Sequence, residues 1–200
     1  MTTLLQINSS LSGDQGHSSY LSNQFRARWR EQNPNGRAIV RDLARQPIPH
    51  LDAERLHAFI TPADKRSATQ QEIVDYSDQL IAELREANLV VFGVPMYNFG
   101  IPSTLKAYFD HVARSGETFR YTSDGPQGLL EDKPVYIMAT RGGVYEGTDA
   151  DTQTGYINTF LGFLGLKQIH FVYAEGLAMG DERQHKTLRE AELAITDLAA

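Results

Sequence analysis

The sequence predicts an α/β protein in which a parallel β-sheet is covered by helices on both faces. Short apolar runs of strand length recur along the chain, and segments with the spacing of amphipathic helices separate most of them. The runs are apolar at consecutive positions, so both faces of each strand must be buried. Alternating strands and helices of this kind indicate a doubly wound sheet.

Five segments are predicted to be strands, each rich in β-branched or aromatic residues. They are residues 4–7, 39–43, 89–94, 135–139 and 169–173. Five parallel strands with helices on both faces are typical of a flavodoxin-like sheet.

The clearest helix is predicted over residues 68–87, where apolar side chains recur every three or four positions opposite a charged face. The same spacing predicts a C-terminal helix over residues 188–198. Further helices are expected over residues 20–30 and from Ser103, which we expect to be the N-cap. Turn residues within 119–130 predict a turn or hairpin before the fourth strand.

Composition limits the classes of partner. A chain of 200 residues with 41% hydrophobic content fits one domain, and its mild net charge of −6 has no basic stripe for nucleic acid. There is no cysteine, which excludes disulfides and Cys-ligated metals, and the histidine spacing suggests no metal site. No run approaches the ~20 apolar residues that span a bilayer. We therefore expect a cytoplasmic protein with no membrane or nucleic-acid partner.

The loop after the first strand, residues 8–19, is rich in hydroxyls and glycine. It lacks both GxxxxGK[ST] and GxGxxG, so neither a nucleoside-triphosphate nor a dinucleotide loop is present. Free amides at a helix N-terminus, helped by serine hydroxyls, can still bind one terminal phosphate. The candidates are the hydroxyls of Ser10, Ser12, Ser18 and Ser19 and the amides of Gly16, His17 and Ser18. The alternative is a solvated loop in which Ser18 caps the helix and His17 lies on the surface.

The loop after the third strand begins where Pro95 ends that strand, at the sheet edge where ligands of such folds bind. Met96, Tyr97 and Phe99 can pack on a flat ring, and the amide of Asn98 can bond its polar edge. The alternative is that the three apolar side chains belong to the core or to an interface.

The stretch from Pro95 to Pro102, PMYNFGIP, followed by Leu105, Lys106 and Asp110, resembles the signature of the FMN-dependent NAD(P)H azoreductases, which also reduce quinones. The resemblance covers nearly the whole chain. It includes TFRY at residues 118–121, RGG at 141–143 and FLGFLG at 160–165. It implies one flavodoxin-like FMN-binding domain over residues 1–200, one FMN per subunit and a homodimer with active sites near its interface.

The resemblance also implies a set of site residues. The phosphate is expected to bind Ser10, Gly16, His17 and Ser18, and the ring to lie against Pro95, Met96, Tyr97, Asn98, Phe99, Thr140, Arg141, Gly142 and Gly143. Many relatives carry serine in place of Gly16, so either Ser12 or Ser19 compensates or the phosphate binds more weakly. Arg141 either lies on the surface or stabilises negative charge on the reduced flavin. Tyr121 and Phe163 are expected in the acceptor pocket, and residues 159–166 at a dimer seam.

The implied reaction needs no catalytic side chain, because the cofactor carries the chemistry. NADH or NADPH would pass hydride to flavin N5, and a quinone or an aromatic azo compound would then be reduced to the hydroquinone or the amines in a ping-pong cycle. Two alternatives stay open: a flavodoxin-type electron carrier, and a domain that binds another phosphorylated ligand without redox chemistry. The preferred nicotinamide and the physiological acceptor are not determined by the sequence.

Overall fold

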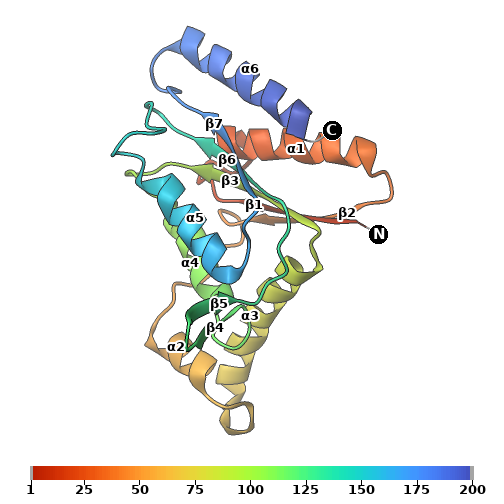
Figure 1. Ribbon diagram of the computed structural model, residues 1–200, viewed down its shortest axis with the longest axis vertical. Helices are drawn as coiled ribbons and strands as arrows, with labels where there is room; N and C mark the ends of the chain where they lie inside the picture. The colour runs from red at the N-terminus through yellow and green to blue at the C-terminus, as the bar shows by residue number, and fades with distance from the viewer. Residues whose placement is uncertain (1, 199–200) are drawn as a thin grey trace.

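A central sheet of five parallel strands forms the middle layer of the molecule (Figure 1). The computed structural model describes residues 2–198. The strands lie in the order β2-β1-β3-β6-β7. Their bounds are β1 Thr3–Asn8, β2 Arg37–Asp42, β3 Leu89–Pro95, β6 Val135–Thr140 and β7 Ile169–Ala174. All five predicted strands and the flavodoxin-like order are thereby confirmed.

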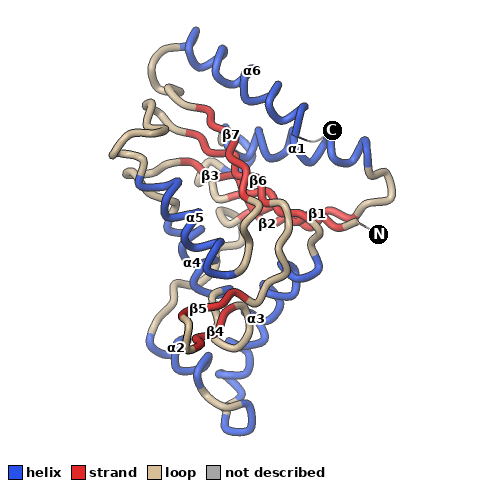
Figure 2. The backbone as a smooth tube through the Cα atoms, in the orientation of Figure 1, coloured by secondary structure: helices blue, strands red, loops and turns tan. Residues whose placement is uncertain are grey.

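Helices cover both faces of this sheet, as the doubly apolar strands require (Figures 1 and 2). One face packs on α1, His17–Gln32, and α6, Asp181–Leu198. The other packs on α3, Ala68–Glu86, α4, Ser103–Val112, and α5, Thr152–Leu164. Alternate residues of one strand divide between the two layers, since Leu4 belongs to the first core and Leu5 to the second.

Three helix starts differ from the sequence predictions. Helix α6 begins at Asp181, seven positions before the expected residue 188. Helix α1 starts three positions before the expected Tyr20. At α4, the N-cap is Pro102, with no side-chain hydrogen bond, and Ser103 is the first helical residue. The prediction of Ser103 as N-cap is therefore wrong by one residue, because proline already supplies a φ angle that suits a helix start.

No helix range was predicted for α5, and a second helix, α2, Ala53–Ile60, was not predicted either. The side chain of Asp52 caps it by accepting a hydrogen bond from the amide of Arg55 at 2.9 Å. Short 3₁₀ turns cover Gly13–Gln15 and Ala63–Lys65. At eight residues α2 is only about two turns long, which is too short for its apolar periodicity to identify a helix from the sequence.

The predicted hairpin is present, formed by β4, Phe119–Thr122, and β5, Gly125–Gly128, in antiparallel pairing. It packs against the C-terminal end of α5: the amide of Leu130 donates to the carbonyl of Leu164 at 3.0 Å. A Cβ at Gly128 would lie 2.2 Å from the amide nitrogen of Gly165, so only glycine permits this approach. The hairpin thus lies far from the carboxyl edge of the sheet (Figure 2).

Strand register brings three loops to one edge. Asn8 of β1 pairs with Gly93 of β3, and Pro95 of β3 pairs with Thr140 of β6. The loops that follow β1, β3 and β6 consequently leave the sheet beside one another. Ligands of doubly wound sheets bind at this edge.

Candidate cofactor cleft

The three loops at the carboxyl edge line a cavity of about 320 Å³. Most of the residues predicted from the sequence meet here. They are Ser10, Gly16, His17, Pro95, Met96, Tyr97, Thr140, Arg141 and Gly142, with Ser12 beside them. Residues more than a hundred positions apart in the chain therefore surround one space.

One end of this cavity meets the N-terminus of α1. The helix begins after Gly16 without any side-chain cap, so its first amides have no partner within the helix. Ser18 is fully buried, and its hydroxyl has no hydrogen-bond partner among the described residues. The alternative in which Ser18 caps the helix is therefore wrong. An uncapped helix start beside a free hydroxyl fits a phosphate group.

The space next to Gly16 is filled by Ser10. A Cβ built on Gly16 would lie 2.0 Å from the Ser10 hydroxyl oxygen. Ser12 lines the cavity but is exposed, whereas Ser18 and Ser19 are both fully buried outside its lining. Ser10, a candidate in its own right, thus occupies the position that a side chain at residue 16 would take.

His17 is the first residue of α1 and is half-buried. Its Nε2 lies 3.2 Å from the side-chain nitrogen of Gln184 on α6. Because that amide nitrogen only donates, Nε2 accepts the hydrogen bond, and His17 ties α6 to the phosphate end of the cavity. His17 is thus only partly exposed, and its ring is held by a contact with α6.

The loop after β3 is a tight turn. The amides of Tyr97 and Gly100 each donate to the other's carbonyl at 3.0 Å. Asn98 and Phe99 between them have φ angles of 50° and 63°. Asparagine tolerates this left-handed conformation, whereas a phenylalanine there is strained by about 1–2 kcal/mol. Such strain is found preferentially at functional sites.

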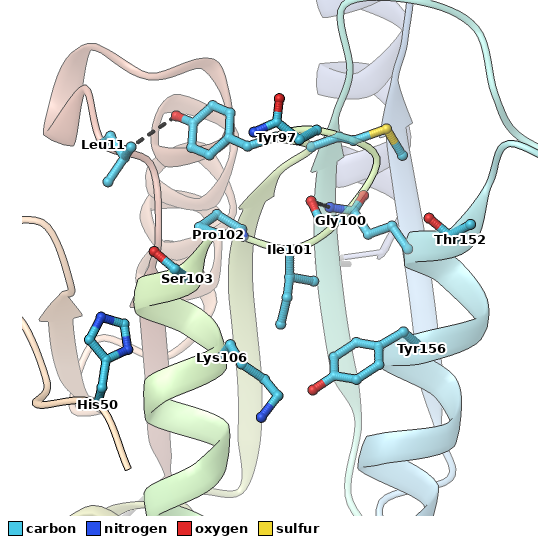
Figure 3. Close-up of a pocket in the computed structure, with 13 residues that line it drawn as sticks. Leu11, His50, Tyr97, Gly100, Ile101, Pro102, Ser103, Lys106, Thr152 and Tyr156 are labelled. Carbon is cyan, nitrogen blue, oxygen red and sulfur yellow. Dashed lines mark hydrogen bonds between the residues drawn. The ribbon is translucent and has the colours of Figure 1, made fainter. Parts of the chain in front are cut away.

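The side chains of this turn point in different directions. Met96 and Tyr97 are half-buried and line the cavity, and the Tyr97 hydroxyl accepts a hydrogen bond from the amide of Leu11 at 3.2 Å (Figure 3). Asn98 is exposed. Phe99, 53% exposed, meets the ring of Tyr145 edge to face at 5.6 Å. The alternative that Phe99 belongs to the core is wrong.

A second cavity of about 870 Å³ lies between α4 and α5 and shares Met96 and Tyr97 with the first. Asn98 lines this one rather than the smaller cavity. In Figure 3, Lys106 on α4 and Tyr156 on α5 face each other across it. Sequence reasoning missed Gln153, which also lines it, because this residue belongs to no motif and does not follow a strand.

Arg141 is 1% exposed, so the expectation of a surface residue is wrong. Its guanidinium donates to Asp151 at 2.8 Å and to Glu175 at 2.9 Å, and lies 4.9 Å from the ring centre of Tyr173. Burial would raise the pKa of Asp151, but hydrogen bonds from Thr154 and from Arg141 lower it below its usual range. With two carboxylates around one cation, Arg141 offers no free positive charge to a bound ring.

Gly143 does not line the cavity, although the preceding Gly142 does. A Cβ there would lie 2.6 Å from the hydroxyl oxygen of Tyr145. Its carbonyl accepts from the amide of Gly176 at 2.8 Å, while the carbonyl of Gly142 accepts from Ala178 at 3.0 Å. The two glycines thus join the loop after β6 to the loop after β7 and allow a tyrosine ring to lie on the backbone.

Tyr121 and Phe163 do not reach the cleft within one chain. Tyr121, on β4, is 73% exposed, and Phe163 packs on Phe119 with ring centres 4.4 Å apart. Phe163 is near the C-terminal end of α5, about 16 Å along the helix from Thr152 at the cavity. Within a single copy of the chain they lie away from the cleft, because the hairpin packs at the opposite end of α5, and their place in an acceptor pocket stays a prediction.

The fold and the site define a flavodoxin-like protein whose cleft suits a phosphorylated ligand with a flat ring. A family model described as "Flavodoxin-like fold" matches residues 2–198. An FMN-dependent NADH:quinone oxidoreductase of Cellvibrio japonicus is 61% identical over 184 residues, 92% of each chain. One from Burkholderia lata is 51% identical over 195 residues, 98% of each chain. The chain therefore belongs to the flavodoxin-like family of quinone reductases and azoreductases.

Solved structures agree with this family. An FMN-dependent NADH-azoreductase from Bacillus anthracis in complex with FMN superposes with a TM-score of 0.88 at 27% identity. The match covers 100% of both chains. Among residues 2–198 no helix is both long enough and apolar enough to span a membrane.

Proposed function

We propose that this protein is an FMN-dependent oxidoreductase that uses NADH to reduce quinones to hydroquinones and aromatic azo compounds to amines. The observation that carries the proposal is the cleft at the carboxyl edge, where an uncapped helix N-terminus and a strained aromatic turn surround one space. The names of the relatives support FMN as cofactor and NADH as donor. They do not favour the electron-carrier alternative.

In this proposal the phosphate of FMN binds at the start of α1. The free amides of its first turn and the hydroxyls of Ser10 and Ser18 supply hydrogen bonds. Among the described residues, neither a lysine nor an arginine free of carboxylate partners lines this end of the cavity, so the helix dipole supplies the positive potential. The first-strand loop therefore anchors the cofactor without a cationic side chain.

The ring binds among Pro95, Met96, Tyr97, Thr140 and Gly142, with Asn98 at its edge. Met96 and Tyr97 supply polarisable and aromatic surface, and the amide of Asn98 both donates and accepts. Phe99 belongs to the loop after β3, and Arg141 and Gly143 belong to the loop after β6, so their backbone forms part of the same walls around the ring. Bound FMN supplies the two-electron chemistry that no side chain of the chain provides.

A homodimer is part of the proposal, because one chain leaves the acceptor side of the cleft open. The prominent aromatic residue of the hairpin, Tyr121, is 73% exposed, as expected of a side chain that serves another copy. Tyr121 and Phe163 then line the partner's cleft, and residues 159–166 contribute to the seam. Sedimentation velocity tests this arrangement: a monomer at assay concentration contradicts it.

The decisive experiment is anaerobic mixing of the FMN-loaded protein with NADH and, separately, NADPH. Rapid loss of the oxidised-flavin absorbance, followed by its return on addition of a quinone, is expected. Steady-state rates with NADH and quinone varied together should give the parallel lines of a ping-pong mechanism. A protein that binds FMN but is not reduced by either nucleotide would be a carrier, and one that binds no FMN would contradict the proposal altogether.

The preferred electron acceptor is tested by comparing kcat/KM for benzoquinones and for azo dyes in the same preparation. A pocket made of flat aromatic surface accepts both classes, and quinones need one NADH per turnover whereas an azo bond needs two. The cytoplasmic location stays a prediction, which cell fractionation tests.

A further inference from the structure

A buried glutamine connects the Arg141 cluster to the turn that follows β3. Gln153 is the second residue of α5 and is 0% exposed. Its side-chain oxygen accepts from Nε of Arg141 at 3.3 Å. Its side-chain nitrogen donates to the carbonyl of Pro95 at 3.1 Å and to the carbonyl of Gly100 at 3.3 Å. These two carbonyls stand at the beginning and at the end of the turn.

The orientation of this side chain is dictated by its partners. Arginine only donates, so it must face the amide oxygen of Gln153. The amide nitrogen then faces two carbonyl oxygens, which only accept. No other assignment of the amide satisfies all three partners, and a glutamate would place an oxygen against two oxygens.

Arg141 is itself held rigidly. Asp151 and Glu175 bind its guanidinium, and Glu175 also accepts from the amides of Tyr145 and Glu146 at 3.0 Å each. The start of α5 and the loops after β6 and β7 are thus fastened to one buried cation. Gln153 connects this cluster to the strained turn, because it binds both Arg141 and the carbonyls of Pro95 and Gly100.

We propose that Gln153 is a positioning residue for the cofactor ring: held by Arg141, it fixes the turn of residues 96–99 through the Pro95 and Gly100 carbonyls. This inference rests on the proposed function, and it deepens that function by naming a residue outside every recognisable motif. The turn has two residues with positive φ angles, so it needs external contacts to keep its shape. Gln153 touches both of its ends.

The test compares Gln153→Leu with Thr154→Val. Both variants remove one polar partner of Arg141 from the same turn of α5, since the Thr154 hydroxyl lies 2.9 Å from its guanidinium. Of these two residues only Gln153 contacts the turn after β3, and the contact of the Thr152 hydroxyl with the Phe99 carbonyl is unchanged in both variants. Urea unfolding of each variant measures the general loss of stability, so that effects on the cofactor can be compared at known stability.

We expect Gln153→Leu to weaken FMN binding on the order of tenfold and to shift the flavin reduction potential, because two buried carbonyls lose their donor. Thr154→Val should keep both quantities close to those of the parent protein. If the two variants lose similar stability and Gln153→Leu keeps the parent affinity and potential, the residue is structural only and the proposal is overturned.

A cofactor-free measurement separates this inference from the proposed function. Chymotrypsin cleavage after Phe99, followed by mass spectrometry on the apoprotein, reports how firmly the turn is held. Cleavage of Thr154→Val under the same conditions serves as the control. Faster cleavage at Phe99 in Gln153→Leu alone supports the inference even if the protein binds no FMN, and equal cleavage in both variants overturns it. Gln153→Glu, which keeps the size of the side chain but not its donor, gives the same test should Gln153→Leu not fold.

Discussion

The hydroxyl of Ser10 occupies the space beside Gly16 that any larger residue at position 16 would need. An ideal Cβ on Gly16 would lie 2.0 Å from Oγ and 2.6 Å from Cβ of Ser10. Both distances are far below van der Waals contact, so the two positions are coupled: a side chain at one requires movement at the other. The coupling lies at the start of α1, where the proposed phosphate site is formed.

Gly16→Ala should therefore disturb the phosphate loop. We expect the free energy of unfolding to fall by about 1–3 kcal/mol, as in other overpacked sites, and FMN affinity to fall with it. Urea unfolding and FMN fluorescence titration measure the two effects. The double variant Ser10→Gly with Gly16→Ala should regain most of the lost stability, because the clash is removed. Equal stability and affinity of Gly16→Ala and the parent protein would contradict this account.

Asn98 has a side-chain role that can be separated from its backbone role. Asn98→Gly removes the amide and tolerates the φ angle of 50°, whereas Asn98→Ala removes the same amide and adds backbone strain of about 1–2 kcal/mol. If the amide bonds the ring, both variants should bind FMN more weakly and shift its reduction potential. Alanine should in addition be the less stable of the two in urea. Unchanged affinity, potential and turnover in both variants would show that the amide makes no contact with the cofactor.

Arg141 is predicted to be essential for stability because its removal leaves Asp151 and Glu175 buried without a cation. Arg141→Ala should lower the free energy of unfolding by about 3–5 kcal/mol, the usual cost of breaking a buried pair. The control is Arg45→Ala, which removes an exposed ion pair with Asp14 and should leave stability nearly unchanged. Similar urea midpoints for the two variants would contradict the prediction.

His111 should make stability depend on pH. Burial lowers its pKa below the ordinary value, and its Nε2 donates to the carbonyl of Pro49 at 3.0 Å. Below a pH of about 6.5 the histidine of the unfolded chain binds a proton, whereas the buried histidine of the folded protein stays neutral. The free energy of unfolding is therefore highest above this pH and falls as the pH drops below it. Urea unfolding at pH 7.5 and 5.5 should show a smaller loss for His111→Gln than for the parent protein. His185→Gln, an exposed control, should behave like the parent.

The sequence by itself determined the fold and the edge that binds ligands. Apolar runs such as residues 89–94 reveal buried strands because both of their faces must leave water, and this requirement is local. The rule that ligands bind beyond the carboxyl ends of strands then placed Ser10, Tyr97 and Thr140 near one another, and register confirms this. Helix α2 was missed because its eight residues make only about two turns, too few for a periodic pattern to stand out.

Only the tertiary structure decided which way side chains point and what they touch. Arg141 follows a strand as predicted, yet its guanidinium pairs with Asp151 and Glu175 and is not free to bind a ligand. These carboxylates come close to it only when α5 and β7 pack beside β6. Tyr121 lies far from the cleft because the hairpin docks at the opposite end of α5. Gln153 gains its partners in the same way. These contacts join segments distant in the chain, so their geometry depends on packing between layers, which no local pattern of residues encodes.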